Sequence, residues 1–521
     1  MDMATATATR HVRMRPERGE ARGASIAAVL CALAAWWSAP AAAQQAFIEP
    51  SLTGSLTWSD NVGADRRDKG SGFVAEVSPG VAVSREGGRV SGQLNARLRN
   101  QVDFSGRGKD TSFLSLVGRG SVEALEKLLF FDLDASVTRD NLSLFAGRAR
   151  GDALNTDSDS ETRSFGVAPR LELRHGDTAA TLRYIARWLD GGADEFDRQR
   201  LGQWTLDAGN ATAFGYLGWG VSYSHADTAY GDSDSPDVTQ EIARATLFIN
   251  ATPQLRLRLI GGHESNDYAV RKGESGSITG AGFDWTPNPR TNISATTEKR
   301  IFGRGHNVSI DYRRARSAFQ LGWSRDITSS LQTLATLYQD PFFRLFYDAL
   351  AASISDPLER EQAVRELLQA LGYGDVGLRD AVIANNYFLD RRLQAGFSLI
   401  GVRNVLSLSF TRSHRERLGE VAMVNPQDDL SVFDEVREKT AALRFTHRLS
   451  GKSSLNAGLA RTEARGAGIR RIDTRRTLFS LGLSTQLSPD TTGSLAYRRQ
   501  KSAGSSSFTE NAITASVFMR F

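Results

Sequence analysis

The C-terminal stretch 509–521, TENAITASVFMRF, limits most strongly what this chain can fold into. Apolar residues recur there at every second position, and small or polar residues fill most of the positions between them. Chain ends fray unless something holds them, so a terminal strand of this kind needs a partner. The last strand of an outer-membrane β-barrel has one, because it pairs with the first strand and closes the sheet. The alternative is the edge strand of a soluble sandwich.

The end of this stretch also resembles the signal that the bacterial barrel-assembly machinery recognises, in which apolar residues alternate up to a terminal aromatic residue. We therefore expect the barrel-assembly machinery to be a partner of this chain. The predicted assembly signal consists of Ile513, Ala515, Val517, Met519 and Phe521.

The first 43 residues have the features of a secretory signal peptide. Several arginines precede an apolar run over 24–37, and three alanines stand before Gln44. No other stretch approaches the roughly 20 apolar residues that a helical membrane span needs. We predict a signal peptide at 1–43 and an outer-membrane barrel at 44–521, reached by export to the periplasm. The only cysteine, Cys31, lies in the predicted signal, so a disulfide or thiolate metal site is not expected in the mature chain.

Alternation of apolar and polar residues continues along most of the chain. It is clearest over 90–104, where Val90, Leu94, Leu98 and Val102 share one face. Strands of soluble sandwiches usually contain about 5 to 6 residues. The alternating runs are longer than that, and they fit strands that cross a bilayer at a tilt.

Short turns alternate with longer, charged connections, as the periplasmic turns and external loops of outer-membrane barrels do. The pattern predicts an all-β fold, a single antiparallel transmembrane barrel of about 22 strands (range about 18 to 24), with both termini on the periplasmic side. The connection near 303–305 is unusually short for an external loop. Short turns are expected near 86–88, 126–127, 175–177, 209–210, 252–253, 287–289, 313–316, 402–404, 450–452 and 488–490.

One segment, about 328–385, breaks the strand pattern and predicts a helical insertion in an external loop. Asp340-Pro341 and Asp356-Pro357 have the form of helix starts, and Gly372 has the form of a helix end. Apolar residues follow both starts at helical spacing. Two roles are open: a self-packed helical hairpin over the barrel mouth, and a plug or recognition cap.

Arginine dominates the basic residues, since only eight of the 64 lysines and arginines are lysines. Many arginines alternate with apolar residues, so they would face the lumen and could favour anions there. The competing interpretation is that acids on the same face pair with them. The candidate lumen-lining residues are Arg97, Arg99, Arg119, Arg170, Arg174, Arg183, Arg187, Arg256, Arg258 and Arg444.

The sequence contains no motif for catalysis or metal binding. It has no nucleophile elbow and no phosphate loop, and its histidines lack metal-ligand spacing. The acidic segments 155–161 and 232–237 lack the glycine and final glutamate of a complete calcium loop. We therefore expect no enzyme activity, no cofactor and no metal. The modest net charge of +5, without a basic helix, gives no support for nucleic-acid binding.

The start of the mature chain resembles a known family. The segments 50–62, containing Thr57-Trp58-Ser59-Asp60-Asn61-Val62, and 77–81, followed by Gly87-Gly88-Arg89, are similar to PEP-CTERM-system-associated outer-membrane β-barrels. The resemblance implies a Gram-negative outer-membrane protein linked to exopolysaccharide production and to surface sorting of PEP-CTERM proteins. It brings no catalytic positions.

Two functions follow as expectations. The first is a channel or export conduit, with outer-membrane lipid around it and exopolysaccharide as a candidate solute. The second is a non-conducting structural or assembly partner that recruits another envelope protein through the helical loop. A TonB-dependent transporter is disfavoured, because no plug domain of the needed size precedes the first strand.

Overall fold

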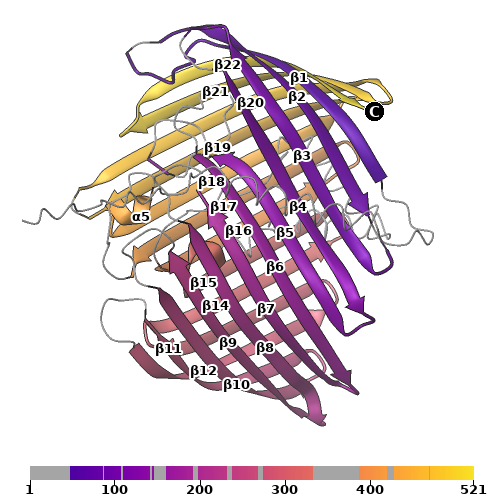
Figure 1. The fold of residues 1–521 in the computed structure, drawn as a ribbon, viewed down its shortest axis with the longest axis vertical. Helices are drawn as coiled ribbons and strands as arrows, with labels where there is room; N and C mark the ends of the chain where they lie inside the picture. Colours follow the sequence, from indigo (N-terminus) through magenta and orange to yellow (C-terminus); the bar gives the residue numbers. More distant parts are fainter. Residues whose placement is uncertain are drawn as a thin grey trace, which may run out of the picture. The chain divides into compact units, whose positions relative to one another are not determined.

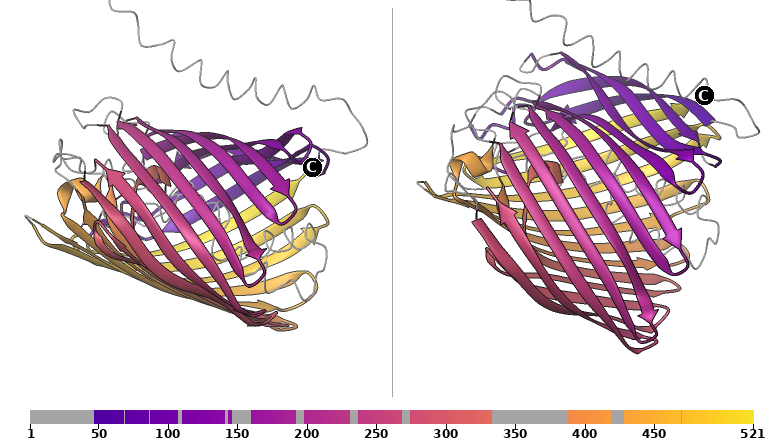
Figure 2. Two further views of the ribbon diagram at one scale, coloured as in Figure 1. Left: turned by 90° about the horizontal axis from the view of Figure 1, so that it is seen from below. Right: turned by 60° about the horizontal axis from the view of Figure 1, so that its bottom comes forward.

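The computed structural model describes residues 47–521 except 68, 86, 107–109, 141–142, 146–159, 192–197, 231–236, 268–273, 333–386, 419–427 and 469. The described residues form one antiparallel sheet of 22 strands, in which each strand pairs with the next along the chain and β22 pairs with β1. Figure 1 and Figure 2 show tilted strands forming both the near and the far wall of this ring. The predicted closed barrel of about 22 strands is confirmed.

The strands are long, as the sequence pattern predicts. The first eleven are β1 (Phe47–Ser59), β2 (Gly72–Arg85), β3 (Val90–Asp103), β4 (Thr111–Leu125), β5 (Leu129–Asp140), β6 (Ser160–His175), β7 (Thr178–Asp190), β8 (Gln199–Phe214), β9 (Leu217–Tyr230), β10 (Val238–Thr252) and β11 (Leu255–Asn266). The others are β12 (Glu274–Asn288), β13 (Thr291–Arg300), β14 (Gly303–Arg314), β15 (Ser317–Thr328), β16 (Phe388–Ile400), β17 (Asn404–Arg417), β18 (Glu435–Arg448), β19 (Ser453–Ala467), β20 (Ile472–Ser488), β21 (Thr491–Gly504) and β22 (Phe508–Arg520). A short helix, α5 (Asp429–Val432), precedes β18.

The C-terminal strand closes the ring, as predicted. The ladder between β1 and β22 runs from Ser51 opposite Arg520 to Ser59 opposite Ala512. The backbone N–H of the final residue, Phe521, donates to the carbonyl of Pro50 at 2.9 Å. The end of the chain is therefore held within the ladder instead of fraying.

The Asp60-Asn61 pair extends this seam past the last rung of the ladder. The Asp60 carboxylate accepts hydrogen bonds from the backbone N–H and the side-chain amide of Asn511, at 2.7 and 2.6 Å. The Asn61 amide donates to the carbonyls of Asp65 and Thr509, at 2.8 and 3.0 Å. The dipeptide on which part of the family resemblance rests thus fastens the first loop to the last strand.

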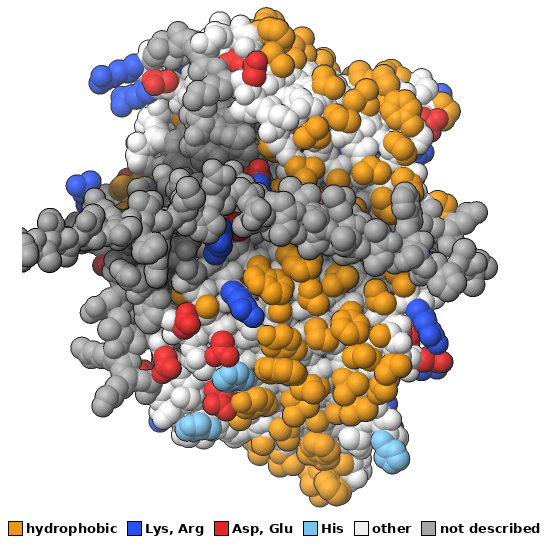
Figure 3. Space-filling view, viewed as in Figure 1, with side chains coloured by type: hydrophobic (Ala, Val, Ile, Leu, Met, Phe, Trp, Pro, Cys, Tyr) orange, Lys and Arg blue, Asp and Glu red, His pale blue; other side chains and the backbone are white. Residues whose placement is uncertain are grey.

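The outer face of the barrel is apolar. Exposed leucines, valines and aromatic residues stand at alternate positions along the strands, for example Leu98 and Val102 on β3. Figure 3 shows a broad band of hydrophobic side chains on the visible face, with charged side chains along its left and right sides. Only a closed barrel or helices can satisfy all backbone polar groups within lipid. A closed antiparallel barrel with this outer face is an outer-membrane β-barrel, and the chain is localised there.

Among the described residues, no helix is long and apolar enough to cross a membrane.

The two ends of the barrel differ in their connections. Two-residue turns such as Gly176-Asp177 and Gly215-Tyr216 join strands at one end, and both glycines adopt positive φ. Connections at the other end are mostly longer, although Ile301-Phe302, 468–471 and 505–507 are short. Short turns are periplasmic in such barrels, and Phe47 and Phe521 lie at that same end. We therefore assign the short-turn end to the periplasm.

One predicted turn, near 209–210, is wrong. β8 continues through Gly209 to Phe214, with an irregular register between Asn210 and Phe214. A Cβ on Gly209 would lie 2.8 Å from the carbonyl oxygen of Trp219. The glycine therefore serves the close approach of β8 to β9, and the true turn, Gly215-Tyr216, lies six residues later.

The predicted signal peptide at 1–43 lies outside the described residues. So does the predicted helical insertion, apart from its edges: Ser330–Gln332 begin a helical turn, and the described chain resumes at Tyr387.

Candidate functional site

The structure places all ten candidate arginines on the inner face of the wall. Each stands at a position that alternates with exposed apolar residues of its own strand, as Arg183 and Arg187 alternate with Leu182 and Trp188. They come from six strands: Arg97 and Arg99 from β3, Arg119 from β4, Arg170 and Arg174 from β6, Arg183 and Arg187 from β7, Arg256 and Arg258 from β11, and Arg444 from β18.

A charge cluster on this face lies on β5, β6 and β7. The Asp132 carboxylate accepts from Arg170 Nε at 3.2 Å and lies 3.5 Å from Arg183 Nη2. Arg170 also pairs with Glu172 on its own strand. Acids on the same face therefore neutralise these arginines, as the competing interpretation of the sequence expects.

Asp134 and Arg187 form an ion pair that passes over an intervening strand. Asp134 on β5 and Arg187 on β7 both stand opposite Gly166 on β6, and Arg187 Nη2 lies 2.7 Å from Asp134 Oδ1. A Cβ at Gly166 would lie 2.5 Å from that same oxygen. The glycine therefore leaves the space in which the two side chains meet, and the side chain of Arg187 is only 5% exposed.

These groups surround a pocket of about 420 Å³ in the wall. Arg119, Arg183 and Arg187 line it together with Asp132 and Asp134. Arg85, serine and glutamine side chains of β2 to β4, and the apolar side chains of Leu133, Val167, Ala168 and Ile185 also line it. The pocket therefore combines charges of both signs, hydrogen-bonding groups and apolar surface.

Other predicted arginines also have local partners. Arg99 binds the Glu76 carboxylate through two nitrogens, at 2.8 and 2.6 Å, and Gln101 donates to the same carboxylate. Arg258 Nη2 lies 3.2 Å from Asp284 Oδ1. Bidentate pairs of this kind fix the guanidinium plane as well as its charge.

A second, more deeply buried network was not predicted from the sequence. Arg300 on β13 binds Glu264 on β11 at 2.6 Å, and their side chains are 2% and 1% exposed. Arg300 also lies 3.6 Å from Glu298 and 3.4 Å from Asp326. Glu264 also accepts a hydrogen bond from the backbone N–H of Ile301 at 2.8 Å, so it holds the short link at 301–302. The partners lie two strands apart, so no local spacing marks them.

Described loop residues contact each other across the external mouth. Asp429 of α5 accepts from the Ser143 hydroxyl at 2.6 Å and from the Leu144 backbone N–H at 2.7 Å. The rings of Phe145 and Phe433 pack edge to face, with centroids 5.0 Å apart. These residues come from the β5–β6 and β17–β18 connections, which occupy nearly opposite places in the ring. The contact therefore narrows the external mouth.

A second buried cluster lies at the same end. The hydroxyl groups of Tyr387 and Thr228 are 2.9 Å apart, and Tyr230, Ile327 and Leu389 pack around them. Burial raises the pKa of the Tyr387 phenol, so it stays protonated and able to donate at neutral pH. The external end is thus built from packed side chains as well as loops.

The segments considered for calcium, 155–161 and 232–237, lie mostly outside the described residues. In the described part of the chain, no group of three or more histidine, cysteine, aspartate or glutamate side chains is placed to hold a metal ion.

No protein-family model matches this sequence, and no curated protein matches it. Among solved structures it is similar to the siderophore receptor PirA from Acinetobacter baumannii, with 9% identity over 91% of this chain and 80% of that one and a TM-score of 0.46. A ferric enterobactin receptor (PfeA) variant from Pseudomonas aeruginosa has 12% identity, coverage of 92% and 82%, and a TM-score of 0.44. A loop-deletion variant of OmpT, an outer-membrane protein of Vibrio cholerae, has 10% identity, coverage of 92% and 100%, and a TM-score of 0.31.

Proposed function

We propose that this barrel is an outer-membrane conduit for polar, hydroxyl-rich solutes. The observation that carries the proposal is a charge cluster on the inner wall in which arginines pair with acids, mostly across strands. In the β5–β7 cluster, three arginines (Arg170, Arg183 and Arg187) meet three acids, Asp132, Asp134 and Glu172. A wall of this kind is hydrophilic without a strong net charge, so a polar solute can move along it without being trapped.

The size of the ring supports the same proposal. Barrel diameter grows with strand number, and 22 strands exceed the roughly 16 to 18 of porins that enclose an aqueous channel. Described side chains narrow the external mouth, through the contact between Asp429 and Ser143-Leu144. A wide polar path with a restricted mouth suits a flexible chain better than a compact solute of the same mass.

The sequence resemblance to PEP-CTERM-associated barrels makes exopolysaccharide the first solute to consider. Hydroxyl groups of a glycan would find partners along the wall in paired acids, arginines, serines and glutamines. This finer assignment rests on the resemblance and on the polar wall together.

Reconstitution in planar bilayers tests the conduit. We expect conductance with weak ion selectivity, because the wall charges are paired. The variant Asp132→Asn/Asp134→Asn should shift the reversal potential toward anion selectivity, since it leaves Arg170, Arg183 and Arg187 without these acids. Conductance that stays absent even when Asp429→Ala removes the mouth contact would contradict the proposal. That outcome would favour the alternative, a non-conducting barrel that recruits another envelope protein.

A further inference from the structure

The periplasmic rim carries an arginine cluster whose surroundings differ from those of the inner wall. Arg290 lies in the β12–β13 turn, and Arg313, Arg314 and Arg316 lie in and beside the β14–β15 turn. All four side chains are exposed. None of them takes part in an ion pair with a described residue, whereas the arginines of the β5–β7 cluster do. These four residues are called the rim arginines below.

The same sector of the rim is basic beyond these four residues. The turn segments 286–292, 312–318, 400–404 and 447–454 contain no aspartate or glutamate. They also contribute Arg403, Arg448 and Lys452. Elsewhere on the rim, basic residues have acids nearby: Arg520 lies 3.7 Å from Glu49 and 3.6 Å from Asp490. Among the described residues, one side of the periplasmic mouth therefore presents positive charge without ion-pair partners.

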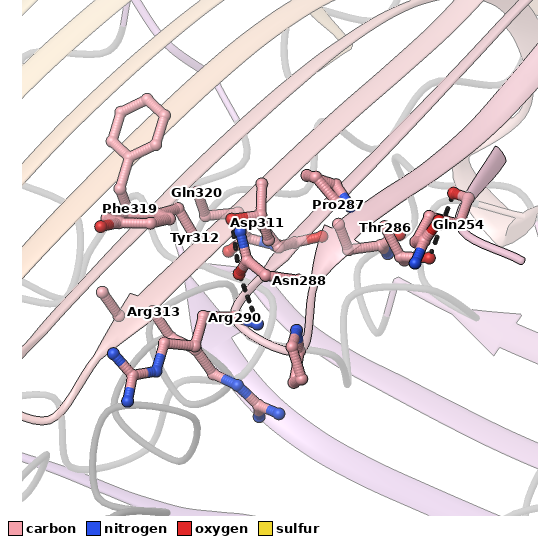
Figure 4. A pocket seen from close by; sticks show the side chains of 14 residues that line it. Gln254, Thr286, Pro287, Asn288, Arg290, Asp311, Tyr312, Arg313, Phe319 and Gln320 are labelled. Atoms are coloured by element: carbon pink, nitrogen blue, oxygen red, sulfur yellow. Dashed lines mark hydrogen bonds between the residues drawn. The ribbon is translucent and has the colours of Figure 1, made fainter.

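Two rim arginines line a pocket of about 580 Å³ at this mouth. Figure 4 shows the side chains of Arg290 and Arg313 extending in the same direction, away from the ring of Phe319. Tyr312 is 38% exposed among the outward-facing apolar residues, so its neighbours Asp311 and Arg313 face the lumen. Tyr312 and Phe319, which stand opposite each other on the outward face, also line the pocket. The pocket therefore lies at the rim of the wall, and Asp311 and Arg313 form its luminal side.

The rest of the lining mixes polar groups with apolar surface. The apolar part comes from proline, alanine and aromatic side chains: Pro287, Pro289, Ala318, Tyr312 and Phe319. Amide groups come from Gln254, Asn288, Asn292 and Gln320, and a hydroxyl comes from Thr286. Asp311 is the one carboxylate in the lining, and it accepts a hydrogen bond from Ser309 at 3.2 Å. Guanidinium groups beside amides and hydroxyls match a ligand that carries both carboxylates and sugar hydroxyls.

We propose that this pocket is a capture site for an anionic, carboxylate-bearing glycan chain that enters from the periplasm. This inference rests on the proposed conduit function and adds the charge class of its solute. Unpaired arginines at the mouth attract the carboxylates and raise the local concentration of the chain. The paired charges beyond them then let the chain pass without a second strong site.

Direct binding tests the capture site without requiring conduction. The purified mature barrel in detergent is titrated by calorimetry with a short oligogalacturonate, with a malto-oligosaccharide of the same length and with inorganic phosphate. We expect the oligogalacturonate to bind, the neutral sugar to bind at least tenfold more weakly, and phosphate to compete only weakly. Binding should also weaken as salt is added.

Variants locate the site. Arg290→Gln/Arg313→Gln should weaken oligogalacturonate binding by about tenfold or more, because it removes two charge-assisted contacts. The matched control Arg89→Gln/Lys127→Gln removes two exposed charges from other turns at the same end and should leave the affinity unchanged. Asp311→Asn should tighten binding, since it removes the one acid of the pocket. This last variant gains affinity, so its result cannot be produced by misfolding.

Equal loss of affinity in the pocket variant and in the control would overturn the proposal, because it would indicate diffuse attraction to the rim. Equal binding of the neutral sugar would overturn it as well, as would tighter binding of an anionic phospholipid micelle than of the oligogalacturonate. Conductance without oligogalacturonate binding would refute the capture site and leave the conduit standing. Binding of the oligogalacturonate without conductance would refute the conduit and leave the capture site standing.

Discussion

Arg187 and Arg313 are the same kind of residue on the same inner face, yet their surroundings give them opposite properties. Arg187 lies in the wall, 5% exposed, and is paired with Asp134 at 2.7 Å. Arg313 lies at the periplasmic rim, is exposed, and lines a pocket whose one acid is Asp311. The comparison teaches that wall arginines such as Arg187 stabilise the barrel through ion pairs, whereas rim arginines such as Arg313 are available to bind the proposed anionic glycan. The number of arginines in the sequence does not separate these two roles.

Among residues at the periplasmic rim, Phe521 is the one whose substitution we expect to damage the fold most. Phe521→Asp places a charge at the end of the closing strand, beside the bond from Phe521 to Pro50. We expect most of the protein to fail to assemble in the outer membrane, because the predicted assembly signal loses its terminal aromatic residue. Heat-modifiable migration of membrane fractions measures this. Normal barrel formation in the variant would contradict the account.

Breaking a buried wall pair should have the next largest effect. Glu264→Leu leaves Arg300 buried without its nearest acid, which should lower the free energy of unfolding by about 3–5 kcal/mol. Urea titration of the refolded barrel in lipid measures the change. The double variant Glu264→Leu/Arg300→Met removes both charges and should recover most of the loss. A double variant as unstable as the single one would show that the uncompensated charge is not the cause.

The glycine between Asp134 and Arg187 offers a test of intermediate size. Gly166→Ala places a Cβ against the Asp134 carboxylate, so we expect a loss of about 1–3 kcal/mol by the same measurement. Gly261→Ala is the matched control, because a Cβ at Gly261 meets no atom within 4 Å. Equal effects of the two substitutions would mean that strand propensity, and not the ion pair, sets the cost.

The smallest effect on stability is expected at the rim arginines. Arg313→Gln should change the free energy of unfolding by less than about 0.5 kcal/mol, because an exposed charge without a close partner adds little to stability. Urea titration alongside the two wall variants gives a direct comparison. A loss of unfolding free energy comparable to that of Glu264→Leu would contradict the view that wall charges stabilise the fold and rim charges do not.

Local patterns were sufficient to predict most of the fold. Period-2 alternation identifies strands because each lipid-facing side chain must be apolar, and turn residues mark the ends of hairpins. The closing pair of strands follows from an even strand number and from the apolar face of 509–521. The error near 209–210 arose because a glycine–asparagine pair has the composition of a turn, whereas here the glycine lets two strands approach.

The pairing of charges could not be predicted in the same way. Arg187 and Arg174 both stand on the inner face, and only the register across β5, β6 and β7 shows that Arg187 faces Asp134 over a glycine. Glu264 and Arg300 likewise meet across an intervening strand, and Asp429 meets Ser143 from another part of the ring. Such contacts depend on long-range geometry. Only the start of α5 has a local cause, because the Asp428 side chain caps this helix by accepting hydrogen bonds from the backbone N–H groups of Leu430 and Ser431.

The ion pair that passes over Gly166 also has a mechanical consequence. The backbone hydrogen bonds of the sheet join only adjacent strands. They allow neighbouring strands to rotate relative to each other, so they resist bending of the wall only weakly. A bond from β5 to β7 on the inner side works as a cross-brace, because flattening the wall at β6 would pull Asp134 and Arg187 apart. Repeated at β11 and β13 by Glu264 and Arg300, such braces stiffen a wide, thin-walled cylinder against ovalisation under the lateral pressure of the bilayer.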